Sequence, residues 1–326
     1  MTARDTALTV AVAAAWGLCF VLLQALAPMR SPLILAGVRA LLGGAILAVA
    51  VVRRGGPRRL MHGGAGWRVT APLALLNGAI ALGAMFLAAG RAGVAAETVV
   101  GNTQPILLGL AGAVIFGERV GRRGATGIAL GAVGVLLVAA GGRTSGSSLG
   151  GLSLALLSSA GPAAGTILMR RLVGRVDLLV VTAWQFLAGG AALLAVGAVV
   201  AGPFAPRLDA AGALALVFLG VVGTGVAYLV WFGLLERVSL ARLGSALYLV
   251  PVAGVAADIL SGGRVGPTEL VGLAVMLVGV ALAAGWPATG GGTAVTGASR
   301  SAARVPGPSS TPLSRASGTS HSPAAG

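Results

Sequence analysis

The chain has 326 residues, of which 56% are hydrophobic and only 10% are charged, and its formal net charge is +15. In a soluble domain roughly a quarter of the residues are charged, so this chain cannot cover a water-facing surface with polar groups. Its 23 basic residues are all arginines spread between apolar runs, whereas a nucleic-acid-binding protein gathers them on one face among aromatic side chains. The composition therefore excludes a soluble globular protein and a nucleic-acid partner, and it indicates a lipid bilayer as the solvent.

Ten apolar stretches are long enough to cross a bilayer, which requires about 20 helical residues. In chain order they are residues 6–27, 33–52, 69–90, 94–116, 124–141, 149–169, 178–200, 210–234, 238–260 and 267–286. Because these ten stretches fill nearly all of residues 1–286, we predict an all-α integral membrane protein with ten transmembrane helices. The first stretch has no clear cleavage site and is followed by further spans, so we interpret it as a helix and not as a signal peptide.

The sequence repeats itself about 146 residues apart. The region of the fourth and fifth spans is echoed by that of the ninth and tenth, and Pro105 aligns with Pro251. We therefore predict one five-helix repeat over residues 1–143 and a second over residues 144–287. Because five is odd, the two repeats are expected to be inserted in opposite directions, related by a pseudo-two-fold axis in the membrane plane.

Arginines in the short loops predict the orientation, since cytoplasmic loops carry the excess of positive charge. Thirteen arginines lie in or beside the loops after even-numbered spans: Arg53, Arg54, Arg58, Arg59, Arg68, Arg119, Arg122, Arg123, Arg170, Arg171, Arg175, Arg237 and Arg242. Five lie after odd-numbered spans: Arg30, Arg91, Arg143, Arg207 and Arg264. We expect a multi-pass protein of the cell membrane with both termini in the cytoplasm.

The remainder of the chain offers little chemistry of its own. Residues 288–326 are rich in Gly, Ser, Thr, Ala and Pro without periodicity, so we expect a disordered cytoplasmic tail. The single cysteine, Cys19, and the two histidines form no metal-ligand or catalytic motif. An intramembrane enzyme would need a nucleophile with a base, or a metal set, at membrane depth. We therefore expect no enzyme activity, no metal and no cofactor.

Glycines recur at near-helical spacing in the last helix of each repeat. They are Gly127, Gly131 and Gly134 in the fifth span, and Gly272 and Gly279 in the tenth. Small residues let helix backbones approach closely in a membrane, so helix packing is the first interpretation. A homodimer face formed by the same glycines is the alternative.

Several motifs occur in a characteristic order along the chain. They are Trp16-Gly17, Arg39, Ala95-Ala96, Pro105, Gly117-Glu118-Arg119 and the glycines of the fifth span. In this order, and with ten duplicated spans, the chain resembles the EamA-type family of the drug/metabolite transporter superfamily. The second half departs from the pattern, because Gly263 replaces the expected glutamate and Gln185 stands in the place of Arg39. The resemblance implies ten helices, a central substrate path, and export or uptake of small metabolites.

Polar side chains inside spans indicate where a substrate could bind, because burying an ionised one costs about 2.5–3.5 kcal/mol and such groups usually face a cavity. The fourth span carries Glu97, Asn102 and Gln104, followed by Pro105. The proline removes a backbone hydrogen bond and leaves the Gly101 carbonyl free. We expect this kinked helix to form one wall of a substrate site. Alternatively, the proline only bends the helix for packing and the amides bond a neighbouring helix.

Further polar or amphipathic groups could line the same cavity: Arg39, Asn77, Gln185, Tyr228 and Tyr248. Arg39 could be the counter-ion of a substrate carboxylate, or a structural partner of Glu97 or of a backbone carbonyl. Pro251 is expected to kink the ninth span as Pro105 kinks the fourth, which makes the two helices candidate gates. Glu118 is expected to form an ion pair at the cytoplasmic end of the fourth span.

We predict a secondary transporter that exports small, polar, amino-acid-like metabolites by alternating access between the inverted repeats. The central polar groups are mostly amides with one acid and one arginine, which favours a zwitterionic substrate. A site for cations usually surrounds an acid with aromatic rings, so an exporter of lipophilic cations is one alternative. A membrane scaffold without transport activity is another.

Overall fold

The computed structural model describes residues 2–26, 31–61, 64–91, 97, 100–118, 120–141, 148–201, 208–260 and 266–284. The regular elements in these ranges are all helices, which confirms the all-α prediction for the described part of the chain. The alanine pair at 95–96, Arg119, Gly263 and the predicted tail at 288–326 lie outside the described residues.

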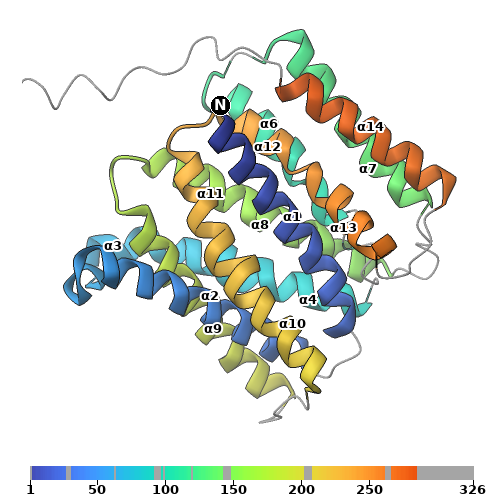
Figure 1. Ribbon diagram of the computed structural model, residues 1–326. Coiled ribbons are helices and arrows are strands. Elements are labelled where there is room, and N and C mark those ends of the chain that lie inside the picture. The colour runs from blue at the N-terminus through green and yellow to red at the C-terminus, as the bar shows by residue number, and fades with distance from the viewer. Residues whose placement is uncertain are drawn as a thin grey trace, which may run out of the picture. The chain divides into compact units, whose positions relative to one another are not determined.

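The helices are shown in Figure 1. They are α1 (Ala3–Leu26), α2 (Pro32–Gly55), α3 (Gly64–Leu73), α4 (Leu82–Arg91), α6 (Gln104–Val114), α7 (Arg122–Gly141), α8 (Leu149–Leu172), α9 (Leu178–Ala201), α10 (Ala210–Gly220), α11 (Ala227–Leu235), α12 (Leu240–Ala246), α13 (Leu249–Leu260) and α14 (Pro267–Ala284). Short π-helical and 3-10 segments join some of them.

Six helical stretches among the described residues are long and apolar enough to cross a membrane. They are Ala3–Leu23, Pro32–Gly55, Gly66–Arg91, Leu149–Leu172, Leu178–Val200 and Ala210–Leu235, and they coincide with the first, second, third, sixth, seventh and eighth predicted spans. Shorter apolar stretches, Leu240–Ala256 and Leu270–Gly279, lie in the ninth and tenth. The count of ten transmembrane helices therefore stays a prediction.

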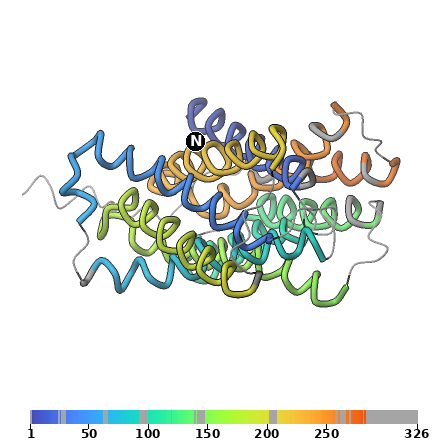
Figure 2. The backbone as a smooth tube through the Cα atoms, turned by 90° about the horizontal axis from the view of Figure 1, so that it is seen from below, coloured from blue at the N-terminus to red at the C-terminus, as the bar shows by residue number. Residues whose placement is uncertain are grey.

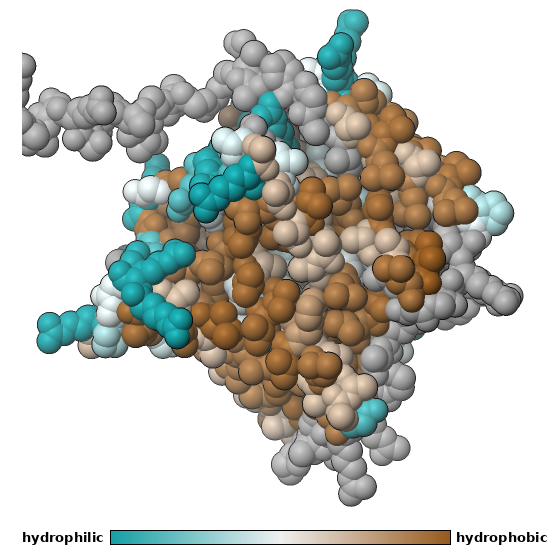
Figure 3. All heavy atoms as spheres, viewed as in Figure 1, coloured by the Kyte–Doolittle hydropathy of each residue, from teal (hydrophilic) through white to brown (hydrophobic). Residues whose placement is uncertain are grey.

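The outer surface carries large apolar side chains on helix faces that no other described helix covers. Leu110, Leu136, Val199, Leu214 and Leu277 are all exposed. Figure 3 shows a mostly hydrophobic face, with hydrophilic side chains gathered at its edges. Such a surface is stable against lipid chains and unstable against water.

Helices of the two halves pack against each other and not only within each half. Helix α1 lies beside α13 and α10 from the second half of the chain, as Figures 1 and 2 show. Helix α2 packs against α9, its counterpart in the second half, and α7 packs against α14 in the same way. The two halves thus form one helical assembly with matched pairs of contacts.

The third helix of each repeat contains a π-helical segment at the equivalent place. Segment η2 (Ala74–Ala81) joins α3 to α4, and segment η4 (Val221–Val226) joins α10 to α11. A π turn widens the helix and redirects its hydrogen bonds, and it often marks a functional site.

The fourth helix of each repeat is broken four residues before its proline. The segment Gly101–Thr103 is a 3-10 turn in which Asn102 has φ −89° and ψ 19°, before Pro105 in the first turn of α6. A turn at 247–248 separates α12 from α13, which contains Pro251. Because proline has no N–H, the carbonyl four residues earlier loses its helical donor, and both breaks fall at that carbonyl.

Glu118 holds the start of α12 and so joins the two repeats. Its carboxylate oxygens accept hydrogen bonds from the backbone N–H groups of Leu240, at 2.8 Å, and Ala241, at 2.9 Å. The chain reverses after α6 at Gly117, which has a φ of +62°, and the Glu118 N–H then donates to the Gly112 carbonyl. This glycine turn aims the carboxylate at the positive end of α12, where a negative charge is favourable.

The glycine stripes of α7 and α14 face each other. A Cβ atom on Gly134 would lie 2.7 Å from the Gly272 carbonyl oxygen, and one on Gly279 would lie 2.7 Å from that of Gly127. These glycines therefore bring the two backbones into contact within one chain. The homodimer stays a prediction, and it gains no support from this stripe.

Substituting Gly134 with alanine should destabilise the α7–α14 pair. The new methyl group would also lie 2.9 Å from the Met276 backbone nitrogen, so the backbones must separate, at a cost of about 1–3 kcal/mol. Thermal unfolding of the detergent-solubilised protein should show a lower Tm for Gly134→Ala. The control is Gly90→Ala, whose Cβ would meet no described atom within 4 Å. Equal Tm values for both variants would contradict the close packing.

Candidate functional site

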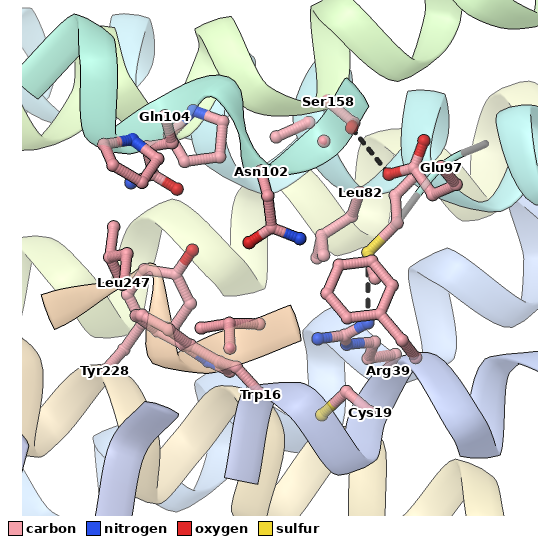
Figure 4. A pocket seen from close by; sticks show the side chains of 17 residues that line it. Trp16, Cys19, Arg39, Leu82, Glu97, Asn102, Gln104, Ser158, Tyr228 and Leu247 are labelled. Carbon is pink, nitrogen blue, oxygen red and sulfur yellow. Dashed lines mark hydrogen bonds between the residues drawn. The ribbon is translucent and has the colours of Figure 1, made fainter. Parts of the chain in front are cut away.

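A central cavity lies between the two halves of the described helices. Its walls come from α1, α2, α4, the broken fourth helix, α8, α11 and the α12–α13 turn. The polar and amphipathic side chains that line it include Trp16, Arg39, Glu97, Asn102, Gln104, Ser158 and Tyr228 (Figure 4). The central cavity thus combines an acid, a base and two amides within an otherwise apolar wall.

Glu97 is only 1% exposed and keeps one carboxylate oxygen without a partner. The Ser158 hydroxyl donates a hydrogen bond of 2.6 Å to its Oε1 atom. Its Oε2 atom is buried and has no hydrogen-bond partner among the described residues. A buried carboxylate oxygen is costly when it accepts no hydrogen bond, so this atom is a ready acceptor for an N–H donor from a ligand.

Arg39 reaches the central cavity from α2 and is only 4% exposed. Its Nε atom donates to the Thr224 hydroxyl at 3.1 Å, and its Nη1 atom contacts the Met85 sulfur at 3.5 Å. Neither partner carries a charge, and no ion pair within the described ranges joins Arg39 to Glu97. The guanidinium therefore keeps an unneutralised positive charge at the cavity wall.

Aromatic rings close one side of the central cavity. The Tyr228 ring lies edge-on to Phe186, with centroids 4.7 Å apart, and 5.5 Å from the Trp16 ring. The Trp16 indole N–H donates to the Gly223 carbonyl at 2.9 Å. Gly223 belongs to the π segment η4, so α1 bonds directly to the irregular backbone that precedes Tyr228.

Three predicted site residues do not line the central cavity. Asn77, in η2, is buried against Gly165, and Gln185, in α9, is also buried. Their side-chain amides have no hydrogen-bond partner among the described residues. Tyr248 points away from the cavity, because its hydroxyl donates to the Ile128 carbonyl at 3.0 Å in α7.

The positions of Arg39 and Thr224 are occupied by uncharged amides, Gln185 and Asn77, in the other half. Thr224 and Asn77 are each the fourth residue of their π segment, and Gln185 stands in α9 where Arg39 stands in α2. Helix α2 packs on η4 in the same way that α9 packs on η2. The duplicated framework therefore places polar residues at four equivalent positions, and only Arg39 among them lines the central cavity.

Sequence reasoning missed Ser158, Met85 and Thr224. Ser158 holds the candidate acid, while Met85 and Thr224 hold the candidate base. The sequence did contain a signal for Ser158, because a pair of serines at 158–159 interrupts an apolar helix and is buried in the structure. A methionine inside an apolar span carries no such signal.

Comparison with known proteins identifies relatives along most of the chain. The model of the EamA-like transporter family matches residues 6–140 and again residues 149–285. The chain is 29% identical over 279 residues to a chloroplastic WAT1-related protein of Arabidopsis thaliana, and the match covers 82% of this chain and 66% of that protein. It is 29% identical over 290 residues to a probable amino-acid metabolite efflux pump of Salmonella typhimurium, covering 86% of this chain and 94% of that protein.

Two further matches extend these findings. An uncharacterized inner membrane transporter of Escherichia coli strain K12 is 28% identical over 282 residues, covering 82% of this chain and 86% of that protein. A solved crystal structure superposes with a TM-score of 0.72 at 22% identity, covering 87% of this chain and 97% of that chain. The superposition shows a shared fold.

Replacing Thr224 with valine should destabilise the protein by removing the acceptor that holds Arg39. Leaving a buried guanidinium N–H without a partner costs about 1–3 kcal/mol, so the Tm in detergent should fall. Thr182→Val is the matched control: each threonine also donates to a carbonyl of its own helical segment, but Thr182 has no hydrogen bond to a charged group among the described residues. A Tm loss no larger for Thr224→Val than for Thr182→Val would exclude a structural role for the Arg39 contact.

Proposed function

The chain belongs to the EamA-like transporter family, and we propose that it is a secondary transporter that exports small zwitterionic, amino-acid-like metabolites across the cell membrane. One observation supports the choice of substrate. The central cavity is lined by a carboxyl group whose buried Oε2 atom has no hydrogen-bond partner among the described residues, and by a guanidinium that forms no ion pair with them. A relative in Salmonella typhimurium bears the name of a probable amino-acid metabolite efflux pump, which agrees with this choice.

The two charged groups suit the two ends of a zwitterion. A substrate ammonium group would donate to the free Oε2 atom of Glu97, and a substrate carboxylate would bind the Arg39 guanidinium in the bidentate manner typical of arginine. Asn102 and Gln104 line the space beside them and can hydrogen-bond a polar side chain of the substrate. Such a substrate neutralises both buried charges at once.

The two alternative functions, export of lipophilic cations and a scaffold role, fit the charged residues of the central cavity less well. A lipophilic cation could bind Glu97 and stack on Trp16 or Tyr228, but the Arg39 charge on the same wall would repel it. A scaffold protein would gain nothing from buried charges that no protein group neutralises, because such charges destabilise the fold. The zwitterion is therefore the preferred substrate class.

Alternating access between two inverted five-helix repeats is the proposed mechanism, with ten transmembrane helices and both termini in the cytoplasm. The matched π segments and the matched breaks before Pro105 and Pro251 support it, because they place irregular backbone at equivalent points around one cavity. The double match to the family model supports the duplication.

Metabolites released by cells that overproduce the protein test the proposal. Small compounds with both an amine and a carboxylate should accumulate outside wild-type cells. They should fall by about tenfold or more with Glu97→Gln or Arg39→Gln at equal membrane levels, because each change removes a charge-assisted bond to the substrate. Mass spectrometry of the medium measures both.

Asp209→Asn is the matched control, since Asp209 is an exposed N-cap residue of α10 and asparagine caps equally well. It should accumulate the same compounds as the wild type. Equal accumulation with Glu97→Gln and the wild type would remove Glu97 from the site. The absence of any enriched zwitterion with the wild type would refute the proposed export.

A further inference from the structure

We propose that a second cavity, the inner cavity, is the cytoplasmic loading site for the same zwitterionic substrate, with Arg54 and Glu236 as its charged contacts and the Tyr228 ring as the partition from the central cavity. This proposal rests on the proposed function and orientation. It adds a binding site and a route that the central cavity alone does not provide.

The inner cavity lies between α2, α9 and α11. Arg54 at the end of α2 and Glu236 just after α11 are both exposed, so this end of the cavity opens to solvent. The remaining lining residues are Leu178, Leu179, Thr182, Tyr228, Leu229, Phe232 and Gly233. The charged opening lies on the side of the arginine-rich loops, which is the expected cytoplasmic side.

Arg54 and Glu236 carry opposite charges at one opening without neutralising each other. The ion pairs within the described ranges join Arg59 to Asp177, at 2.6 Å, and Arg237 to Asp5, at 3.1 Å. Neighbouring charges are therefore paired, while these two face the inner cavity without an ion-pair partner in the described structure. One guanidinium and one carboxylate are also what the central cavity presents, so a zwitterion that fits one cavity has matching groups in the other.

The charged residues of the inner cavity should bind a substrate more weakly than those of the central cavity. Exposed charges attract an ion weakly because water screens them, whereas buried charges interact strongly. The inner cavity is therefore suited to collecting and orienting the substrate, and the central cavity to holding it. A substrate that binds weakly in the inner cavity and more strongly in the central cavity is drawn from the cytoplasmic opening into the protein.

Tyr228 is the residue common to both cavity linings among the described residues. Its ring is packed among Trp16, Phe186 and Phe232, with centroid distances of 5.5, 4.7 and 5.6 Å. Tyr228 is the second residue of α11, which directly follows η4. The Gly223 carbonyl of η4 accepts a hydrogen bond from Trp16 of α1. A movement of α1 relative to α11 would therefore displace the partition.

Transport kinetics test the loading site. Inside-out membrane vesicles present the cytoplasmic face to the medium, and their uptake of a mixture of the twenty common L-amino acids, each ¹⁴C-labelled, is the probe. Arg54→Gln and Glu236→Gln should each raise the apparent KM of that uptake by about twofold to fivefold, the effect of losing one water-exposed ion pair, with little change in maximal rate.

Arg53→Gln is the control, because Arg53 is an exposed neighbour on α2 that does not line the inner cavity. Its KM should equal that of the wild type. Wild-type KM values for Arg54→Gln and Glu236→Gln would overturn the loading site while leaving export intact. No uptake by the wild type would instead refute the proposed function.

Thiol labelling tests the partition without any substrate. Cys19 is the single cysteine of the chain and lines the central cavity (Figure 4). In inside-out vesicles, the membrane-impermeant trimethylammonium-ethyl methanethiosulfonate should label Cys19 about tenfold faster in Tyr228→Ala than in the wild type, because the smaller side chain opens the path. Tyr228→Phe keeps the ring and should label at the wild-type rate.

A second reporter covers the case in which Cys19 is too enclosed to react. Gln104→Cys, made together with Cys19→Ser, places a thiol elsewhere on the central cavity wall. If Tyr228→Ala accelerates labelling of neither thiol from the cytoplasmic face, the ring is not the partition and the proposal fails. This outcome is separable from the kinetics, since labelling needs no transport.

Discussion

The hydrogen-bonding requirement of the backbone organises this structure. Within lipid, irregular backbone is stable only where protein groups or a water-filled cavity satisfy its N–H and C=O groups. Among the described spans, such backbone occurs in η2, in η4, at 101–103 and at 247–248. Trp16 satisfies one such group in η4, because its indole N–H donates a hydrogen bond to the Gly223 carbonyl. Ala81 of η2, the 101–103 segment and Leu247 contribute to the wall of the central cavity, and η4 directly precedes its Tyr228, so irregular backbone marks the site before any charged side chain is considered.

The framework is duplicated, whereas the chemistry is not. Each half repeats the π segment, the broken fourth helix and the close contact between its second helix and the other half's third helix. Charge occurs on one side only: Arg39 has Gln185 as its counterpart, and the buried amides of Gln185 and Asn77 do not reach the cavity. A duplicated framework thus holds one asymmetric site, which would give a bound substrate a defined orientation.

Hydropathy and duplication were sufficient to predict an all-helical membrane protein and six spans that the structure supports. Polar residues at membrane depth also predicted Arg39, Glu97 and Tyr228, which do line the cavity. The same reasoning expected Tyr248 at the cavity, where it does not lie, because hydropathy gives depth along a helix but not the direction in which a side chain points. That direction depends on a partner, and here Gly131 of α7 leaves the space that the Tyr248 ring occupies. The inner cavity could not be predicted at all, since its charged residues sit in exposed helix ends that resemble any cytoplasmic loop.

Two buried charges without counter-ions give the central cavity a reason to change state when it is filled. A ligand shifts a conformational equilibrium only through its different affinity for the two states. Among the described residues, Glu97 and Arg39 contact only neutral partners, Ser158, Thr224 and Met85, and both side chains are almost fully buried. In the proposed function, a zwitterion enclosed by the cavity would give each of the two groups an ionic contact that the empty cavity lacks. Under the proposed function, a zwitterion therefore favours occlusion more than a ligand with a single charge, which leaves either Glu97 or Arg39 without an ionic contact.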